Sequence, residues 1–109
     1  MSTLLQQSAE SAAKQSEEER GRLLAALRAV LAELLPGETV WVYGSAARPG
    51  RFNQHSDIDL ALERRPPRFS EYWLQGELEH RLHRRVDVVL LDDTRLRDKI
   101  TREGLRWML

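Results

Sequence analysis

The feature that most constrains how this chain can fold is the run from Asp57 to Leu62, in which acidic and apolar residues alternate. Residues i and i+2 of a β-strand share a face, so Asp57 and Asp59 point the same way, roughly 6–7 Å apart along the strand. Ile58, Leu60 and Leu62 face the other side and can be buried. Neighbouring carboxylates repel each other unless a cation lies between them. The run therefore predicts a strand with one apolar face and one acidic face, as a Mg²⁺ site for nucleotide phosphates requires.

The composition fits one small soluble domain. The chain has 109 residues, enough for one modest core but not for two, and it is 41% hydrophobic and 31% charged. Lys and Arg together number 17, as do Asp and Glu, so no net charge favours binding to nucleic acid or to a membrane surface. We therefore expect neither direct nucleic-acid binding nor membrane association. The absence of cysteine excludes disulfides and thiolate metal sites.

The N-terminal segment differs in character from the rest of the chain. Residues 1–22 are polar and rich in Ser, Gln, Glu and Ala, which predicts a frayed helix capped by Ser2 or Thr3, an interaction arm or partial disorder. Residues 23–109 are expected to form a single domain. No secretion signal and no apolar run long enough to span a membrane is present, so a cytoplasmic location is expected.

Hydrophobic periodicity predicts two long helices in this domain. The first begins at Leu23, carries an apolar stripe and ends at Pro36-Gly37. The second is capped by Ser70 and runs to about His83. One side of it is apolar and is expected to face the core or a partner; this side carries Trp73, Leu74, Leu78 and Leu82.

Strands and shorter helices complete the predicted α/β plan. Runs rich in β-branched and apolar residues predict strands at residues 39–43, 57–62 and 86–91. A short helix is expected from Ala46 to about Pro49, with Ser45 near its cap. A last helix, capped within residues 92–94, is expected to carry the apolar positions Leu96, Ile100, Leu105, Trp107 and Met108. The expected architecture is a small mixed sheet of three or more strands flanked by helices.

A third carboxylate, Asp87, lies in the otherwise apolar strand predicted at residues 86–91. An isolated buried carboxylate is costly, and it is tolerated when it is paired or bound to a metal. If this strand lies beside the strand at 57–62, Asp87 joins Asp57 and Asp59. Three carboxylates can then hold two Mg²⁺ ions about 4 Å apart, an arrangement that serves in-line displacement at phosphorus.

Three residues after the first predicted strand are suited to phosphate binding. Gly44 lets the backbone approach phosphate oxygens without an intervening side chain. Ser45 can donate its hydroxyl and its backbone N–H at a helix start, where anions are favoured. Arg48 can bind a phosphate or the leaving pyrophosphate.

Each feature has a simpler explanation when it is taken alone. A glycine-serine pair is typical of a turn with a helix cap, and alternating acids are typical of the solvated face of an edge strand. Asp87 alone can pair with Arg84 or Arg85. The order of these features along the chain and the strand parity of the acids favour one shared site.

Other phosphate-binding and metal-binding motifs do not match. A P-loop is excluded because Gly50 stands one place late after Gly44 and Arg51 replaces the required lysine. No Gly-x-Gly-x-x-Gly occurs, so a dinucleotide site has no support. His80 and His83 share a helix face without an evident third ligand, and a zinc site is not expected.

The combined pattern resembles the signature of the minimal nucleotidyltransferases of the DNA polymerase β-like superfamily. That signature is Gly-Ser, often continued by Ala-Arg, then Asp-x-Asp on the next strand and a single Asp on a later strand. The resemblance covers about residues 23–109, and Ile100, Glu103 and Gly104 resemble part of the family's C-terminal helix. The positions that match the signature are Gly44, Ser45, Ala47, Arg48, Asp57, Asp59 and Asp87.

The resemblance implies a Mg²⁺-dependent transfer of a nucleoside monophosphate, usually AMP from ATP, with release of pyrophosphate. It implies that Asp57, Asp59 and Asp87 bind two Mg²⁺ ions, that Asp59 bridges them, and that Asp87 can serve as base for the acceptor hydroxyl. Stand-alone proteins of this length resemble the MNT antitoxin of HEPN–MNT toxin–antitoxin pairs, which can AMPylate a tyrosine of its HEPN partner. A homo-oligomer or hetero-oligomer is compatible with this role.

One loop departs from the family pattern. The eleven residues between Ser45 and Asp57 are one more than the family usually shows, and Pro49-Gly50 stands where a single glycine is usual. The extra residue lies in a loop, so it is expected to alter the phosphate contacts of Arg48 rather than the carboxylates.

Two further functions are compatible with the sequence. A catalytically weak subunit would inhibit or complement a HEPN partner by contact alone, which the N-terminal arm favours. Nucleotidyl transfer to a small molecule such as an aminoglycoside would require a second subunit, because this chain is too short to enclose such an acceptor.

Overall fold

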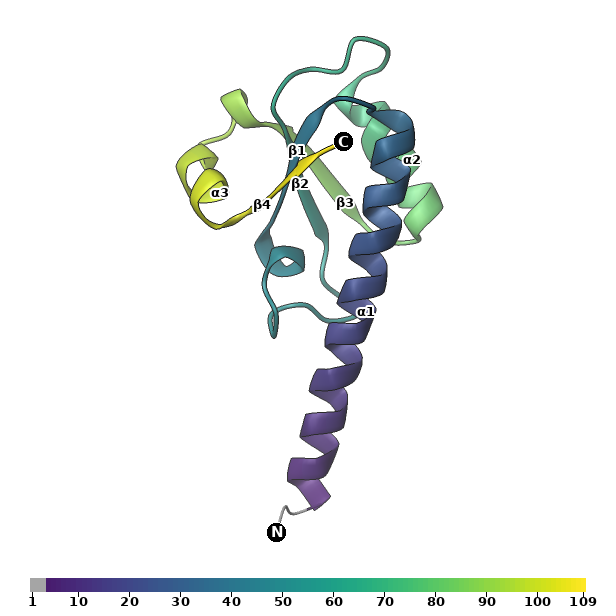
Figure 1. Cartoon of the computed structure of the whole chain (residues 1–109), viewed down its shortest axis with the longest axis vertical. Helices are drawn as coiled ribbons and strands as arrows, with labels where there is room; N and C mark the ends of the chain where they lie inside the picture. Colours follow the sequence, from purple (N-terminus) through teal and green to yellow (C-terminus); the bar gives the residue numbers. More distant parts are fainter. Residues whose placement is uncertain (1–3) are drawn as a thin grey trace.

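The computed structural model describes residues 4–109, and the side chains from residue 10 onward, as a four-stranded sheet with helices on both faces (Figure 1). The strand order is β3-β2-β1-β4; β2 and β3 are parallel, and the other two pairs are antiparallel. The expected mixed sheet flanked by helices is therefore confirmed. In chain order the elements are α1 (Leu4–Leu34), β1 (Thr39–Tyr43), a 3-10 turn (Gly44–Ala47), β2 (Ile58–Leu62), α2 (Glu71–Leu82), β3 (Val86–Leu90), a second 3-10 turn (Leu91–Asp93), α3 (Arg97–Glu103) and β4 (Leu105–Met108).

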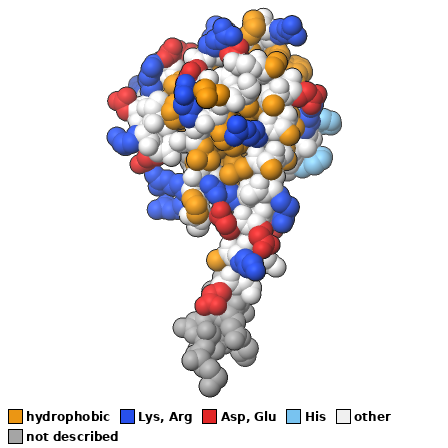
Figure 2. Space-filling model, in the orientation of Figure 1, with side chains coloured by type: hydrophobic (Ala, Val, Ile, Leu, Met, Phe, Trp, Pro, Cys, Tyr) orange, Lys and Arg blue, Asp and Glu red, His pale blue; other side chains and the backbone are white. Residues whose placement is uncertain are grey.

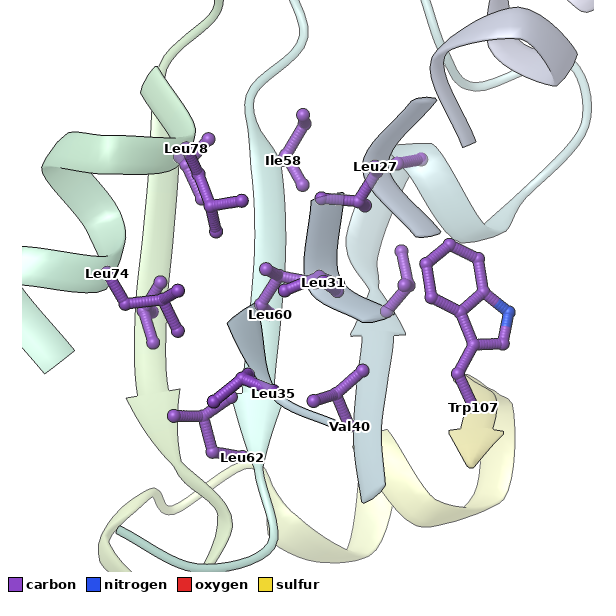
Figure 3. Packing of buried hydrophobic residues seen from close by; sticks show 14 of the residues in the cluster. Leu27, Leu31, Leu35, Val40, Ile58, Leu60, Leu62, Leu74, Leu78 and Trp107 are labelled. Carbon is purple, nitrogen blue, oxygen red and sulfur yellow. The ribbon is translucent and has the colours of Figure 1, made fainter. Parts of the chain in front are cut away.

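The helices α1 and α2 cover one face of the sheet, and the main core lies between this face and the two helices (Figures 1 and 3). The apolar residues of β2 that alternate with its acid point into this core, as the strand pattern predicts. Burying each of these large side chains stabilises the fold by about 1.5–3 kcal/mol. The buried residues labelled in Figure 3 are Leu27, Leu31, Leu35, Val40, Ile58, Leu60, Leu62, Leu74, Leu78 and Trp107.

The opposite face of the sheet carries a smaller cluster under α3 (Figure 1). Ala61, Leu91 and Ile100 are buried there, and Trp41 and Tyr43 pack against them half-buried. Because α3 is only 7 residues long, it covers only part of this face. The remainder of this face is left uncovered by α3.

The helix α1 is continuous, so residues 4–22 extend the helix that was expected to begin at Leu23. This segment is rich in Ala, Gln and Glu, which favour helix. Its N-terminal half projects beyond the sheet, and the molecule measures 56 × 29 × 20 Å (Figure 1). Arg20 Nε ties the helix to the turn after β1 by donating to the Ala46 carbonyl at 2.8 Å. The cap expected at Ser2 or Thr3 lies outside the described residues.

The prediction of a last helix that continues to Met108 is wrong. The helix α3 stops before Gly104, and the residues that follow form β4, which pairs with β1. A Cβ at Gly104 would lie 2.6 Å from the Ile100 carbonyl oxygen and 3.0 Å from that of Val42, so only glycine fits this change of direction. In β4, Trp107 is 8% exposed and Met108 is 69% exposed. Buried and exposed side chains therefore alternate, as they do in a strand.

Smaller differences concern the turn after β1 and the second helix. The 3-10 turn begins at Gly44, with Tyr43 as its N-cap and no side-chain cap, so Ser45 lies within the turn and does not cap it. The Ser70 cap of α2 is confirmed, because its hydroxyl accepts a hydrogen bond from the Trp73 N–H at 3.1 Å. The sequence pattern predicts that Trp73 faces either the core or a partner. Trp73 is 46% exposed, so the expectation that it faces the core is wrong.

The surface of the described residues mixes both signs of charge. On the face drawn in Figure 2, Lys and Arg side chains are interspersed with Asp and Glu, in keeping with equal numbers of each. Within residues 4–109, no helix has both the length and the apolar character needed to cross a membrane.

Candidate active site

The sheet register places Tyr43, Asp59 and Asp87 in one row across three strands. Tyr43 of β1 is paired with Asp59 of β2, and Asp59 is paired with Asp87 of β3. Residues paired across neighbouring strands point to the same face of a sheet. Here that face is the one on which α3 packs, opposite the main core. The parallel pairing of β2 with β3 is the adjacency on which the expected grouping of the acids depends.

The edge strand β3 is held in place by side chains of α2. The N–H of Val86 donates to Glu79 Oε2 at 3.4 Å, and the N–H of Val88 donates to Gln75 Oε1 at 3.1 Å. These bonds satisfy N–H groups that an edge strand would otherwise leave open to solvent. Asp87 lies between the two valines, so its backbone is fixed on both sides while its side chain is exposed.

Gly44 allows the turn after β1 to pass directly beside the Asp59 carboxylate. Its φ of +70° is one that L side chains rarely adopt, and a Cβ at this position would overlap the Asp59 Oδ2 atom. The backbone of the turn and the carboxylate of β2 therefore meet without an intervening side chain. A phosphate group bound at this turn would lie next to Asp59.

Two groups in this row have perturbed acidity. Burial, followed by the negative charges of Asp87 and Asp57, raises the pKa of Asp59 to about 6. Burial, followed by the charges of Asp59 and Asp87, raises the pKa of Tyr43 to about 12. The carboxylates therefore create a local negative potential that disfavours additional negative charge and favours a bound cation.

A cavity of about 330 Å³ opens between the turn after β1 and α3. Asp59 and Gly44 lie in its wall, and three cationic side chains, Arg48, Arg51 and Lys99, line it as well. Arg51 and Lys99 were not among the site residues expected from the sequence. Arg51 lies in a loop and Lys99 on α3, so only the packing of α3 against β1 brings them together.

Arg48 is engaged with a residue of α3. Its Nη2 atom lies 2.5 Å from Glu103 Oε2, and both side chains line the cavity. Ser45 lines the same cavity. All three residues expected to bind phosphate, Gly44, Ser45 and Arg48, therefore border one space.

Asp57 precedes the first residue of β2 and is exposed, and neither Asp57 nor Asp87 lines the cavity. Among the ion pairs of the described residues, none joins Asp87 to Arg84 or Arg85. Asp59 therefore lines the cavity, while Asp57 and Asp87 lie outside its wall.

The donor chemistry of these three acids fits a hard divalent cation. Carboxylate oxygens are the ligands that Mg²⁺ prefers in proteins. After burial, the charges of Asp87 and Asp57 contribute to the raised pKa of Asp59. Among the side chains described, those of residues 10–109, no three His, Cys, Asp or Glu are arranged to hold an ion. Asp57 and Asp87 are exposed, so neighbouring side chains do not enclose their carboxylates. These three residues are the ones that could hold a metal.

Comparison with solved structures finds similar chains, two of them in toxin–antitoxin crystal structures. One comes from a crystal structure of a toxin–antitoxin with AMP-PNP; it is 22% identical, with a TM-score of 0.63, over 78% of this chain and 73% of that chain. The other comes from a crystal structure of a mutant of the toxin–antitoxin MntA-HpeT; it is 25% identical, with a TM-score of 0.59, over 76% of this chain and 70% of that chain. No curated protein matches the sequence.

The family model described as polymerase beta, nucleotidyltransferase matches residues 27–106. This range contains all four strands apart from the last residues of β4, and it includes the turn at Gly44 and the three acids. The match extends over most of the chain and agrees with the observed sheet. The chain therefore belongs to the polymerase beta nucleotidyltransferase family.

Proposed function

We propose that this protein is a Mg²⁺-dependent nucleotidyltransferase that transfers AMP from ATP to a hydroxyl group of a partner protein. The observation that carries the proposal is the pairing of Asp59 with Asp87 beside Gly44, at the wall of a cavity lined by three cations. Negative groups suited to a metal and positive groups suited to phosphates thus border each other. Family membership supports the reaction class, and a similar structure solved with AMP-PNP supports an adenine nucleotide.

The three acids have distinct proposed roles. Asp57, Asp59 and Asp87 would hold the metal; Asp59, which is paired with Asp87 and partly buried, is the most constrained of the three. When bound, Mg²⁺ neutralises charge on the entering and leaving oxygens. Asp87 is exposed on the open side of the face, where an acceptor can approach, and it accepts the proton of the acceptor hydroxyl.

The cavity residues bind and orient the triphosphate. Gly44 and Ser45 offer backbone and hydroxyl donors, while the cations offset the charge of the β- and γ-phosphates. The acceptor oxygen forms a bond to the α-phosphorus, the bond from that phosphorus to the bridging oxygen breaks, and pyrophosphate leaves. In this scheme the protein contributes position and charge rather than a covalent intermediate.

For the acceptor we propose a tyrosine of a HEPN toxin, which makes this protein an antitoxin. Both similar structures come from toxin–antitoxin systems, which supports a toxin partner. The cavity, at about 330 Å³, lies at the small end of ligand sites. It would be filled by the nucleotide, so an acceptor such as an aminoglycoside would have to be held by another subunit.

The test is to incubate the full chain with ATP labelled at the α-phosphate, Mg²⁺ and the product of the adjacent gene. We expect label on that partner with the wild type and with Asp93→Asn, a control that removes an exposed acid outside the site. Asp59→Asn should leave the partner unlabelled. Equal labelling by wild type and Asp59→Asn, or no labelling by either, would contradict the proposal.

A second candidate, inhibition by contact alone, is favoured by the projecting half of α1 (Figure 1). It predicts that Asp59→Asn neutralises the toxin in cells as well as the wild type does. The transferase proposal predicts that this variant fails to neutralise the toxin.

A further inference from the structure

Asp57 lies outside the hydrogen-bond ladder of the sheet. The strand β2 begins at Ile58, so strand pairing does not fix the position of Asp57. The loop that leads to it, residues 48–56, lies within the stretch between Ser45 and Asp57 that is one residue longer than the family pattern. Some other contact must therefore define where this acid stands relative to Asp59 and Asp87.

The side chain of Arg84 contacts three residues of this loop. Its Nη1 atom donates to the Ser56 carbonyl at 2.7 Å and to the Asn53 carbonyl at 3.1 Å. Its guanidinium carbon lies 4.6 Å from the centre of the Phe52 ring, and Phe52 is only 4% exposed. A cation held against a buried ring and two carbonyls is fixed in position. The loop is therefore attached to the turn between α2 and β3.

The peptide on the other side of Asp57 is held by the next residue of that turn. The N–H of Ile58 donates to the Arg85 carbonyl at 2.9 Å. The carbonyl before Asp57 thus binds the Arg84 side chain, and the N–H after it binds the Arg85 backbone. Arg84 lies three residues and Arg85 two residues before Asp87 in the chain. The segments that carry two of the three acids are tied together at this point.

We propose, on the basis of the proposed function, that Arg84 is a positioning residue that sets Asp57 for metal binding. Arg84 makes no described ion pair with any acid of the site, so it acts through the loop backbone. Groups that orient metal ligands typically change metal affinity by about 10–100-fold when they are removed.

The test is the affinity of the full chain for Mn²⁺, measured by electron paramagnetic resonance without nucleotide. Arg84→Ala should bind Mn²⁺ about tenfold more weakly than the wild type. Arg84→Lys, which keeps a cationic donor but loses the planar stack on Phe52, should recover part of the affinity. Arg85→Ala is the matched control and should bind as the wild type does, because Arg85 contributes only its backbone carbonyl.

The melting temperature of each variant separates positioning from folding. Arg84→Ala with a lower melting temperature but unchanged Mn²⁺ affinity would overturn the inference, as would equal losses in Arg84→Ala and Arg85→Ala. If Arg84→Ala does not fold, the Mn²⁺ affinities of Arg84→Lys and Phe52→Leu test the inference instead. Wild-type affinity in both variants would overturn it. Wild-type Mn²⁺ affinity in Asp57→Asn would also overturn it. A wild type that binds Mn²⁺ through Asp57 but transfers no AMP would contradict only the proposed function.

Discussion

Gly44 lies so close to Asp59 that a Cβ atom at position 44 would overlap the Asp59 Oδ2 atom. The same glycine has a φ of +70°, so two independent constraints exclude a side chain there. The turn and the carboxylate meet where we propose that nucleotide and metal meet. This relationship can be tested because the chain contains a second glycine that shares only one of the two constraints.

Gly44→Ala should destabilise the fold more than Gly37→Ala does. Gly37 has a φ of +80° but open space around it, so its substitution carries only the conformational cost of about 1–2 kcal/mol. Gly44→Ala adds the overlap with Asp59, a further cost of about 1–3 kcal/mol. The free energy of unfolding in urea measures both, and AMP transfer should be lost only in Gly44→Ala. Equal destabilisation would show that the approach to Asp59 is unimportant.

Asp59→Asn should stabilise the metal-free protein at neutral pH while abolishing AMP transfer. The folded-state pKa of Asp59 is raised to about 6, so the folded protein binds this proton more tightly than the unfolded chain. The stability from this group is therefore full below the unfolded pKa of about 3.9 and is lost as the pH rises through about 6. Asparagine avoids that loss, which is on the order of 1 kcal/mol after allowance for solvent screening.

The measurement is urea unfolding of wild type and Asp59→Asn across this pH range. The difference between the two proteins should grow from about pH 4 to about pH 7 in favour of the variant. Asp93→Asn is the control and should follow the wild type. A constant difference would mean that Asp59 keeps an ordinary pKa.

Mg²⁺ should raise the melting temperature of the wild type, and the rise should be larger at neutral pH than near about pH 5. Protonated Asp59 competes with the metal at the lower pH, because its pKa is about 6. A chelator should reverse the effect. Asp59→Asn should show no rise at either pH, and a rise in that variant equal to that of the wild type would place the metal elsewhere.

Arg48→Met should raise the KM for ATP by about 10–100-fold, as the loss of a hydrogen bond from a charged group to phosphate implies. Glu103→Gln releases Arg48 from its ion partner, so it should lower the KM or leave it unchanged. Steady-state transfer kinetics give both values, with Arg95→Met, a cation outside the cavity wall, as control. A raised KM in Glu103→Gln would mean that the ion pair holds Arg48 in its binding position.

Local sequence pattern was sufficient for the strands that carry Asp59 and Asp87, although β2 begins at Ile58 and not at Asp57 as expected. The alternation from Asp57 to Leu62 has the period of a strand, and the three apolar residues that it assigns to the core, Ile58, Leu60 and Leu62, are buried. Ala61 is buried as well, on the opposite face under α3, which the alternation does not predict. What the pattern does not contain is the strand order. The pairing of Asp59 with Asp87 depends on β3 lying parallel to β2, a long-range relationship that the resemblance to a family suggested and the register shows.

The parts that the sequence did not predict depend on tertiary contacts. Arg51 and Lys99 meet at the cavity only because α3 packs against β1. The strand β4 has 4 residues, too few for a period of two to be distinguished from a helical pattern. Its pairing with β1 and the burial of Trp107 decide its conformation, and neither is visible in the local sequence.

Trp107→Ala should therefore cost far more stability than Met108→Ala, although the two residues are adjacent. Trp107 is 8% exposed and belongs to the main core, with the Arg28 guanidinium carbon 5.5 Å from its ring centre. Its truncation should lower the free energy of unfolding by about 3–5 kcal/mol. Met108 is 69% exposed, so its truncation should change stability by less than about 0.5 kcal/mol. Urea unfolding of the two variants tests the strand directly, because similar costs at both positions would contradict an alternation of buried and exposed side chains in β4.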